Sequence, residues 1–328
     1  MKVSWGVLST ANIGVEKVIP AMQKGKYSQI SAIASRSIDR AREVARKLEI
    51  PKSYGSYAKL LEDPEIEAVY IPLPNHLHVE WTIKSLEKGK HVLCEKPIGM
   101  NFKEAEHLNQ EMKRFPDLNV MEAFMYRFHP QWKVVKKLLD EGSIGELKNI
   151  HSIFSYYNDN PKDIRNQPEI GGGGLLDIGC YCISSSRFLF NSEPIRVCGT
   201  IEYDPKMKID RLVSAVLEFK NGTSTFTCST QLMAYSRVDI FGTKGKIEIP
   251  MPFVPSPEIP SKIIQQVGSQ TKEFFSETCN QYTIQGDLFS KAILDDIKVP
   301  TPIEDAVANM KVIDKIFESH KKRTWVKL

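Results

Sequence analysis

The first third of the chain alternates short apolar runs with amphipathic helical patterns, and this alternation restricts the possible folds more than any other feature. Between the runs, apolar residues recur at three- and four-residue spacing, and two of these segments end near Gly25 or Gly89. Strands that alternate with helices form a parallel sheet with crossover connections. The expected strands are Val3–Leu8, Ile30–Ala34, Ala68–Ile71, His91–Cys94 and Asn119–Met121, and the expected helices are Ile13–Lys24, Ile38–Leu48 and His78–Lys88. The pattern therefore predicts a doubly wound α/β sheet.

After about Phe124 the pattern changes to a helix at 130–141 followed by strand-like runs with few helices. Such a series predicts a large open, mostly antiparallel sheet, and Asn221-Gly222 predicts a hairpin within it. The expected strands are Lys148–Tyr157, Ile195–Tyr203, Leu212–Phe219, Thr223–Leu232 and Arg237–Phe241; Pro250–Pro260 is an expected surface loop, and the expected closing helices are Tyr282–Ile297 and Ile303–Ser319. At about 150 residues per domain, 328 residues fit two domains. We place them at 1–123 and 124–328, an α+β domain whose last helices can pack back on the first.

The charge balance argues against a nucleic-acid or membrane partner. Lysine and arginine number 44 and aspartate and glutamate 40, and neither sign dominates a long stretch. No run of about 18 apolar residues could cross a bilayer, and the first residues lack the apolar core of a signal peptide. We therefore expect a soluble, cytoplasmic protein with a small-molecule ligand.

The turn after the first strand resembles a nucleotide-binding loop. Residues 6–14 read GVLSTANIG, and although a strict G-x-G-x-x-G is absent, Ser9, Ala11 and Gly14 fall at the three glycine positions. Small residues there let a pyrophosphate approach the backbone at a helix N-terminus. An ordinary strand-to-helix turn explains the same residues equally well. The expected nucleotide contacts from this loop are Ser9, Thr10, Ala11, Asn12 and Ile13.

The end of the second strand indicates which nucleotide binds. Where an NAD-binding fold places a carboxylate for the ribose hydroxyls, this chain has Ser35, Arg36 and Ser37. Hydroxyls and a guanidinium suit a 2′-phosphate, with Arg40 one turn further on as a helper. The alternative is that Arg36 is a solvated surface arginine. The sequence thus favours NADP(H) over NAD(H).

Two motifs follow later strands, at the carboxyl ends where such sheets bind ligands. They read IPLPNHLH at 71–78 and CEKP at 94–97. Together with MEAFMYRFHPQ at 121–131, DIR at 163–165 and GGGGLLDIGCY at 171–181, they make the chain resemble, nearly end to end, the Gfo/Idh/MocA family of NAD(P)-dependent oxidoreductases. The most similar branch contains glucose–fructose oxidoreductase, D-xylose dehydrogenase and dimeric dihydrodiol dehydrogenase. The resemblance implies a homodimer or homotetramer formed through the C-terminal sheet. Further expected nucleotide contacts are Pro72, Leu73, Asn75, His78, Glu95 and Lys96.

The motifs also contain candidates for proton transfer. Oxidising a carbinol requires a hydride acceptor and a base for the hydroxyl proton. The phenol of Tyr181 has an ordinary pKa of about 10, which a nearby ammonium such as Lys96 would lower. Asp177 precedes Tyr181 by four residues, so a helix would place both on one face. We predict Lys96, Tyr181 and Asp177 as catalytic residues; an exposed ion pair, a core aromatic and a helix-start carboxylate are their structural alternatives.

Substrate contacts are expected from the second domain, because sugars are held by hydrogen bonds and by aromatic stacking. The candidates are Arg127, Tyr156, Arg165 and Asp177; Trp132 is more typical of a core, and at most one of Tyr156 and Tyr157 can line a site. His76 and His78 have no second ligand cluster at metal-binding spacing, so no metal is expected.

The residues and the resemblance together predict an NADP(H)-dependent oxidoreductase of a sugar or related polyol. Three alternatives stay open. One is a keto-sugar reductase or dihydrodiol dehydrogenase of the same fold, another is a glucose–fructose-type enzyme that retains its nucleotide, and the third is a non-catalytic NADP-binding sensor.

Overall fold

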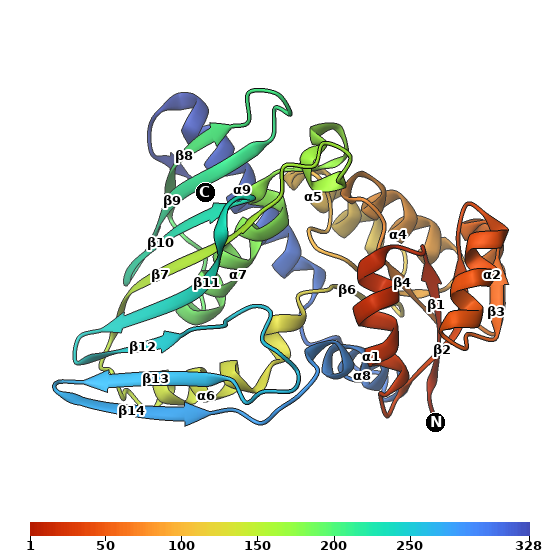
Figure 1. Cartoon of the computed structure of the whole chain (residues 1–328), viewed down its shortest axis with the longest axis horizontal. Helices are drawn as coiled ribbons and strands as arrows, with labels where there is room; N and C mark the ends of the chain where they lie inside the picture. The colour runs from red at the N-terminus through yellow and green to blue at the C-terminus, as the bar shows by residue number, and fades with distance from the viewer. The chain divides into compact units, whose positions relative to one another are not determined.

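The computed structural model describes all 328 residues, and they form two compact units (Figure 1). The first unit consists of Met1–Met125 and Asn280–Val307, and the second of Tyr126–Cys279 and Ala308–Leu328. The segment at 280–307 thus returns to the unit that begins the chain. None of the helices combines the length and the apolar content needed to cross a bilayer.

A six-stranded parallel sheet forms the centre of the first unit. Its order is β3-β2-β1-β4-β5-β6, so the winding direction reverses between β1 and β4. This confirms the predicted doubly wound α/β sheet, and ligands of such sheets bind beyond the carboxyl ends of the strands at the reversal. The strands are β1 (Val3–Leu8), β2 (Ser28–Ala34), β3 (Lys52–Tyr54), β4 (Ala68–Ile71), β5 (His91–Cys94) and β6 (Val120–Glu122).

The helices of the first unit connect these strands. The helix expected at 13–24 begins as a π-helical segment, Gly14–Val18, and continues as α1 (Ile19–Gln23). The others are α2 (Ile38–Lys47), α3 (Tyr57–Leu61), α4 (His78–Glu87), α5 (Phe102–Met112) and α8 (Gln281–Leu294). α8 is hydrogen-bonded to the sheet, because the indole of Trp5, on β1, donates to Ser290 Oγ at 2.9 Å.

A nine-stranded sheet forms the second unit, in the order β14-β13-β12-β11-β7-β10-β9-β8-β15. Only β7 and β10 pair in parallel, which confirms the predicted open, mostly antiparallel sheet. The predicted hairpin is present, but its turn residues are Lys220 and Asn221, since Phe219 pairs with Gly222 and Gly222 begins the next strand. The strands are β7 (Leu147–Tyr157), β8 (Arg196–Tyr203), β9 (Asp210–Phe219), β10 (Gly222–Ser229), β11 (Gln231–Gly242), β12 (Gly245–Ile249), β13 (Lys262–Val267), β14 (Gln270–Phe275) and β15 (Val326–Lys327).

The single strand expected over Thr223–Leu232 is wrong at its end. β10 stops at Ser229, and β11 starts at Gln231. The Ser229 hydroxyl donates to the Arg211 carbonyl at 2.7 Å and accepts from the Gln231 amide at 3.0 Å. These local bonds replace the ladder and redirect the chain into the next strand.

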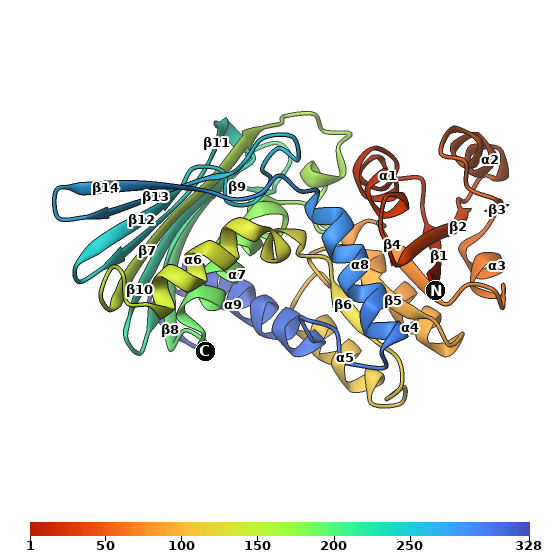
Figure 2. The same ribbon diagram turned by 90° about the horizontal axis from the view of Figure 1, so that it is seen from below.

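Helices cover one face of the large sheet, as Figure 2 shows for α6 (Pro130–Asp140), α7 (Cys180–Phe190) and the end of α9 (Ile303–Lys322). The opposite face carries no helix. A π-helical segment, Leu175–Gly179, leads directly into α7. The predicted loop at 250–260 contains no regular element.

Candidate active site

The loop after β1 has the backbone of a nucleotide-binding turn although its first two glycines are replaced by Ser9 and Ala11. Ser9, at the first glycine position, has a φ of 152°, which side chains other than glycine rarely adopt. Its hydroxyl accepts from the Ala11 amide at 3.0 Å, which stabilises the turn. A Cβ added to Gly14 would lie 3.5 Å from the Pro72 ring, so the loop adjoins the end of β4. Backbone strain of this kind occurs where a loop must approach a ligand, and it fits the pyrophosphate of a dinucleotide.

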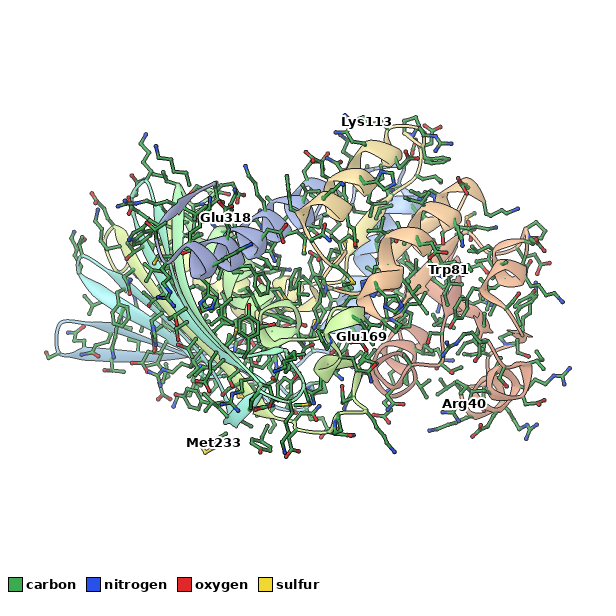
Figure 3. The ribbon with its side chains drawn as sticks, turned by 90° about the horizontal axis from the view of Figure 1, so that it is seen from above. Arg40, Trp81, Lys113, Glu169, Met233 and Glu318 are labelled. Atoms are coloured by element: carbon green, nitrogen blue, oxygen red, sulfur yellow. The ribbon has the colours of Figure 1, made fainter.

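Two arginines near the end of β2 differ in their surroundings. Ser35 is buried and accepts from the Ser37 amide at 3.3 Å, while Ser37 caps α2 by accepting from the Arg40 amide at 3.4 Å. Arg40 lies on the outer surface of α2 (Figure 3) and pairs with Glu43 at 2.8 Å. Arg36 is exposed. Of the two arginines, Arg36 is therefore the better candidate for a 2′-phosphate.

One buried histidine contacts both motifs at the ends of β4 and β5. The ring nitrogens of His78, which is fully buried, lie 2.7 Å from the Leu73 carbonyl and 2.7 Å from the Pro97 carbonyl. Burial lowers the pKa of His78 to about 4, against the opposing effect of the two carbonyls. The peptide bond between Lys96 and Pro97 is cis. His78 therefore fixes the turn that presents Lys96.

Glu95, the residue before Lys96, is fixed by a hydrogen bond from β4. The Tyr70 hydroxyl, on β4, donates to Glu95 Oε1 at 2.6 Å. Burial, and after it the Glu95 carboxylate, raise the pKa of Tyr70, and the same two causes raise the pKa of Tyr282 on α8. No local motif identifies Tyr282, since 187 residues separate it from Glu95 and only the return of 280–307 to this unit brings the two together. Lys96 thus projects from a turn anchored on both sides.

We expect His78→Ala to lower the free energy of unfolding by about 2–3 kcal/mol, because one buried carbonyl loses the donor that the neutral ring supplies and the buried ring leaves a cavity. The same change should weaken nucleotide binding, since the turns beyond β4 and β5 are no longer joined. Urea denaturation and calorimetric titration with NADP+ measure the two effects. His76→Ala is the matched control, because His76 is exposed on the same turn and should stay within about 0.5 kcal/mol of wild type. Equal effects of the two variants would contradict this role.

In the second unit, three predicted substrate residues come together. The Tyr156 hydroxyl donates to Asp177 Oδ2 at 2.5 Å, and Arg165 Nε lies 3.4 Å from the same oxygen. Burial and Asp177 raise the pKa of Tyr156, and Asp177 also raises that of Arg165. Tyr157, next to Tyr156 on β7, is 65% exposed. The cluster therefore joins β7, the loop before α7 and the π-helical segment.

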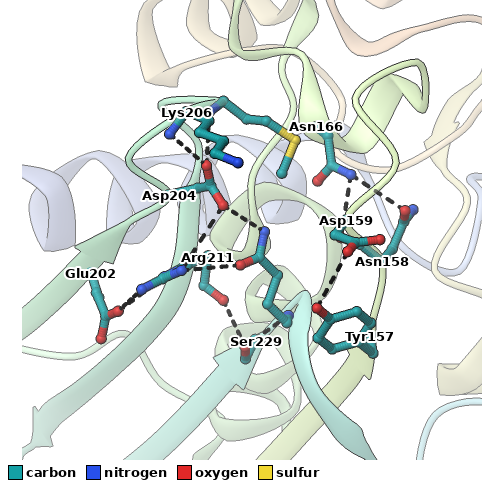
Figure 4. A network of polar contacts seen from close by, with 11 residues as sticks. Tyr157, Asn158, Asp159, Asn166, Glu202, Asp204, Lys206, Arg211 and Ser229 are labelled. Carbon is teal, nitrogen blue, oxygen red and sulfur yellow. Dashed lines mark hydrogen bonds and ion pairs between the residues drawn. The ribbon is translucent and has the colours of Figure 1, made fainter.

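The loop that carries Arg165 is fixed from within. Asn166 is buried, and its side-chain amide donates to the Asn160 carbonyl at 2.9 Å and to Asn158 at 3.3 Å (Figure 4). Asp163 accepts from the Arg165 amide at 2.9 Å and pairs with its guanidinium at 3.3 Å. The position of Arg165 beside Asp177 thus depends on short-range bonds.

Tyr181, in the first turn of α7, is only 5% exposed and lies in an aromatic cluster. Its ring centre is 5.4 Å from that of Phe253, 5.6 Å from Tyr126 and 5.7 Å from Phe154. Arg127 is held against α7, where it donates to Ser184 Oγ at 2.9 Å and lies over the Phe188 ring. Trp132 belongs to the core and donates to the Pro252 carbonyl at 3.0 Å.

Asp210, the first residue of β9, is a further polar residue near the start of α7, and it belongs to none of the sequence motifs. It is buried, and its Oδ2 accepts from the Leu175 amide at 2.6 Å. The nearest sequence signal is the glycine run at 171–174.

Comparison with known proteins accounts for both units. Residues 3–122 match the oxidoreductase family with an NAD-binding Rossmann fold, and residues 132–248 match the GFO/IDH/MocA C-terminal domain. The chain is 36% identical to D-xylose 1-dehydrogenase (NADP(+)) 2 of Haloferax volcanii, over 96% of each chain. It is 34% identical to trans-1,2-dihydrobenzene-1,2-diol dehydrogenase of Xenopus laevis, over 76% of each chain.

A solved structure has the same fold. The 3-ketoreductase KijD10 from Actinomadura kijaniata, in complex with NADP and TDP-benzene, superposes with a TM-score of 0.92 at 28% identity, over 97% of this chain and 98% of that one. A Rossmann sheet and an open antiparallel sheet that both match oxidoreductase domains define an NAD(P)-binding oxidoreductase. The chain belongs to the Gfo/Idh/MocA family, and its relatives include enzymes of sugar hydroxyl and keto groups.

Proposed function

We propose that this oxidoreductase uses NADP(H) to interconvert a carbinol and a carbonyl on a sugar or related polyol. The observation that carries the cofactor preference is the exposed Arg36 between two serines, where a carboxylate would select NAD. The NADP in the name of the Haloferax relative and in the KijD10 complex supports the same choice. In this proposal the first unit binds the nucleotide and the second unit binds the substrate.

The bound nucleotide would supply the hydride acceptor in one direction and the hydride donor in the other. Lys96 donates a hydrogen bond to the reacting oxygen and stabilises negative charge on it. Tyr181, as the phenolate, takes the hydroxyl proton during oxidation, and as the neutral phenol it returns the proton during reduction. The aromatic cluster around Tyr181 excludes water from that proton.

The Tyr156–Asp177–Arg165 cluster suits a polyhydroxylated substrate. It offers a carboxylate that accepts hydrogen bonds and a guanidinium, 44% exposed, that donates them. Asp177 orients a substrate hydroxyl, in keeping with its predicted place beside the reacting group. The helix-free face of the nine-stranded sheet is proposed to pair with a second copy in a homodimer or homotetramer, which the mass from light scattering tests.

A substrate panel tests this proposal. The purified protein is mixed with NADP+ and D-xylose, D-glucose or a trans-dihydrodiol, and with NADPH and a keto sugar, and the absorbance of reduced nicotinamide is followed. Turnover of an aldose is expected. Turnover of the dihydrodiol alone would favour the activity named for the Xenopus relative, and turnover of the keto sugar alone that of KijD10. Bound NADP that survives purification and exchanges slowly would favour an enzyme that retains its nucleotide.

Replacing Arg36 with alanine tests the nucleotide preference. We expect the KM for NADP+ to rise about 10- to 100-fold, because charge-assisted bonds to a 2′-phosphate are lost, while the KM for NAD+ stays unchanged. Arg42→Ala is the matched control, since Arg42 lies on α2 with its side chain 63% exposed. Equal changes for both nucleotides would contradict a 2′-phosphate site.

A further inference from the structure

The start of the helix that carries Asp177 and Tyr181 is bonded to a buried carboxylate on the sheet. Asp210 is 4% exposed, and its Oδ2 lies 2.6 Å from the Leu175 amide nitrogen, which donates to it. A second bond comes from the Gly174 amide. The first amides of a helix have no partner within the helix, so an acceptor from elsewhere decides where the helix begins.

One glycine of the run at 171–174, Gly173, is explained by this carboxylate. A Cβ on Gly173 would lie 1.9 Å from Asp210 Oδ1, and Gly173 has a φ of 125°. Glycine is therefore required there for steric and conformational reasons. The close approach of the loop to Asp210 is built into the fold.

The other end of the π-helical segment is held equally closely. A Cβ on Gly179 would lie 2.8 Å from the Sγ of Cys228 on β10. Asp177 lies between these two points, and Tyr181 follows two residues after Gly179. Movement at Asp210 therefore displaces the two side chains that the proposed function uses.

We propose that Asp210 is a positioning residue, whose carboxylate fixes the helix start that carries Asp177 and Tyr181. This inference rests on the proposed function for its catalytic consequence. Asp210 acts through the backbone of Gly174 and Leu175 and touches no reacting atom.

The groups around Asp210 make its hydrogen bonds to the Gly174 and Leu175 amides dependent on pH. Asp177 on the π-helical segment, Cys228 on β10 and Tyr203 on β8 are the titratable groups whose charges interact with it. Burial is the largest cause that raises the pKa of Asp210, to about 7, and Asp177 adds to it. Above that pH the charged carboxylate accepts strongly from the two amides, and below it the neutral acid accepts more weakly.

The stability of the chain should change in the opposite sense. A carboxyl with a raised pKa binds its proton more tightly in the folded state, so its contribution to stability falls as pH rises from about 4 to about 7. As pH rises towards 7, the helix start is therefore expected to become better ordered while the free energy of unfolding of the whole chain falls. A residue that only stabilised the fold would change both in the same direction.

The experiment compares Asp210→Asn with Asp204→Asn in the full-length enzyme. Asp204 is the matched control, because it accepts from the Lys206 and Met207 amides at 2.8 Å each within the turn between β8 and β9 (Figure 4) and contacts no residue of 174–181. Hydrogen exchange of a peptide spanning 171–181 and the pH profile of kcat between pH 5.5 and 9 are measured. In Asp210→Asn we expect about tenfold faster exchange and about tenfold lower kcat, an unchanged KM for NADP+, and loss of the inflection near pH 7. Asp204→Asn should match wild type.

Unchanged exchange in Asp210→Asn would overturn the positioning role whatever the activity. Faster exchange with unchanged kcat would also overturn it, and Tyr181→Phe then separates the two proposals: an inactive Tyr181→Phe leaves the proposed function standing, and an active one removes it. If Asp210→Asn does not fold, wild-type protection of 171–181, corrected for intrinsic exchange, is followed from pH 5.5 to 8.5. A rise through pH 7 supports the proposal, and a flat or falling profile overturns it.

Discussion

Replacing Lys96 with methionine is expected to lower kcat by about 10³-fold while the protein stays folded. Methionine keeps the unbranched stem and removes the ammonium that holds the reacting oxygen, and loss of one such group removes about 10²–10⁴-fold of rate. The turn itself should persist, because its anchors are the Tyr70–Glu95 bond at 2.6 Å and the His78–Pro97 contact at 2.7 Å. Steady-state kinetics with the best substrate of the panel measure the loss.

The control for Lys96→Met is Lys84→Met, on the surface of α4, where Lys84 pairs with Glu80 and its side chain is 46% exposed. That variant should turn over at the wild-type rate. Binding of NADP+ to Lys96→Met, followed by fluorescence, confirms that the nucleotide site is intact. Turnover of Lys96→Met within a few-fold of wild type would remove Lys96 from the mechanism.

Replacing Tyr181 with phenylalanine is expected to lower kcat by about 10²–10³-fold, with little change in the KM for NADP+. The variant loses the hydroxyl that transfers the proton and keeps the ring that packs against Phe253, Tyr126 and Phe154. The thermal unfolding midpoint should therefore change little. Kinetics and a thermal melt of the same preparation measure both quantities.

Tyr126→Phe is the matched control for Tyr181→Phe, because Tyr126 is fully buried in the same cluster and its hydroxyl donates to Ser184 Oγ at 2.8 Å. Its removal should lower stability by about 1 kcal/mol and leave kcat within a few-fold of wild type. If Tyr126→Phe lost as much activity as Tyr181→Phe, the cluster rather than the Tyr181 hydroxyl would be the cause.

The sequence predicts the central strands well for a physical reason. Ala68–Ile71 and His91–Cys94 match β4 and β5 because a parallel strand covered on both faces consists of consecutive apolar residues. No comparable signal exists for β3 or β14, whose residues are not buried apolar side chains. The end of β10 cannot be predicted from the sequence pattern either, because the strand ends where the Ser229 hydroxyl bonds to the backbone of Arg211 and Gln231.

The residues of the candidate site likewise fall into those that local motifs predict and those that they do not. Asp177, Tyr156 and Arg165 can be named from local motifs, and the structure brings them together. Asp210 and Tyr282 have no motif, since Asp210 acts on a helix start 35 residues away and Tyr282 meets Glu95 only because α8 returns to the first unit. The glycine run at 171–174 is the one local sign that another group approaches closely.

The most direct test of hydride transfer uses the best substrate of the panel, labelled with deuterium at the carbon that bears the reacting hydroxyl. The labelled substrate is mixed with NADP+, and the nicotinamide product is examined by mass spectrometry, with NAD+ in parallel. We predict reduced nucleotide that carries the deuterium, formed faster from NADP+ than from NAD+, and none in Lys96→Met over the same time. Deuterium released to water, or no labelled nucleotide from any substrate, would contradict direct hydride transfer between substrate and NADP+.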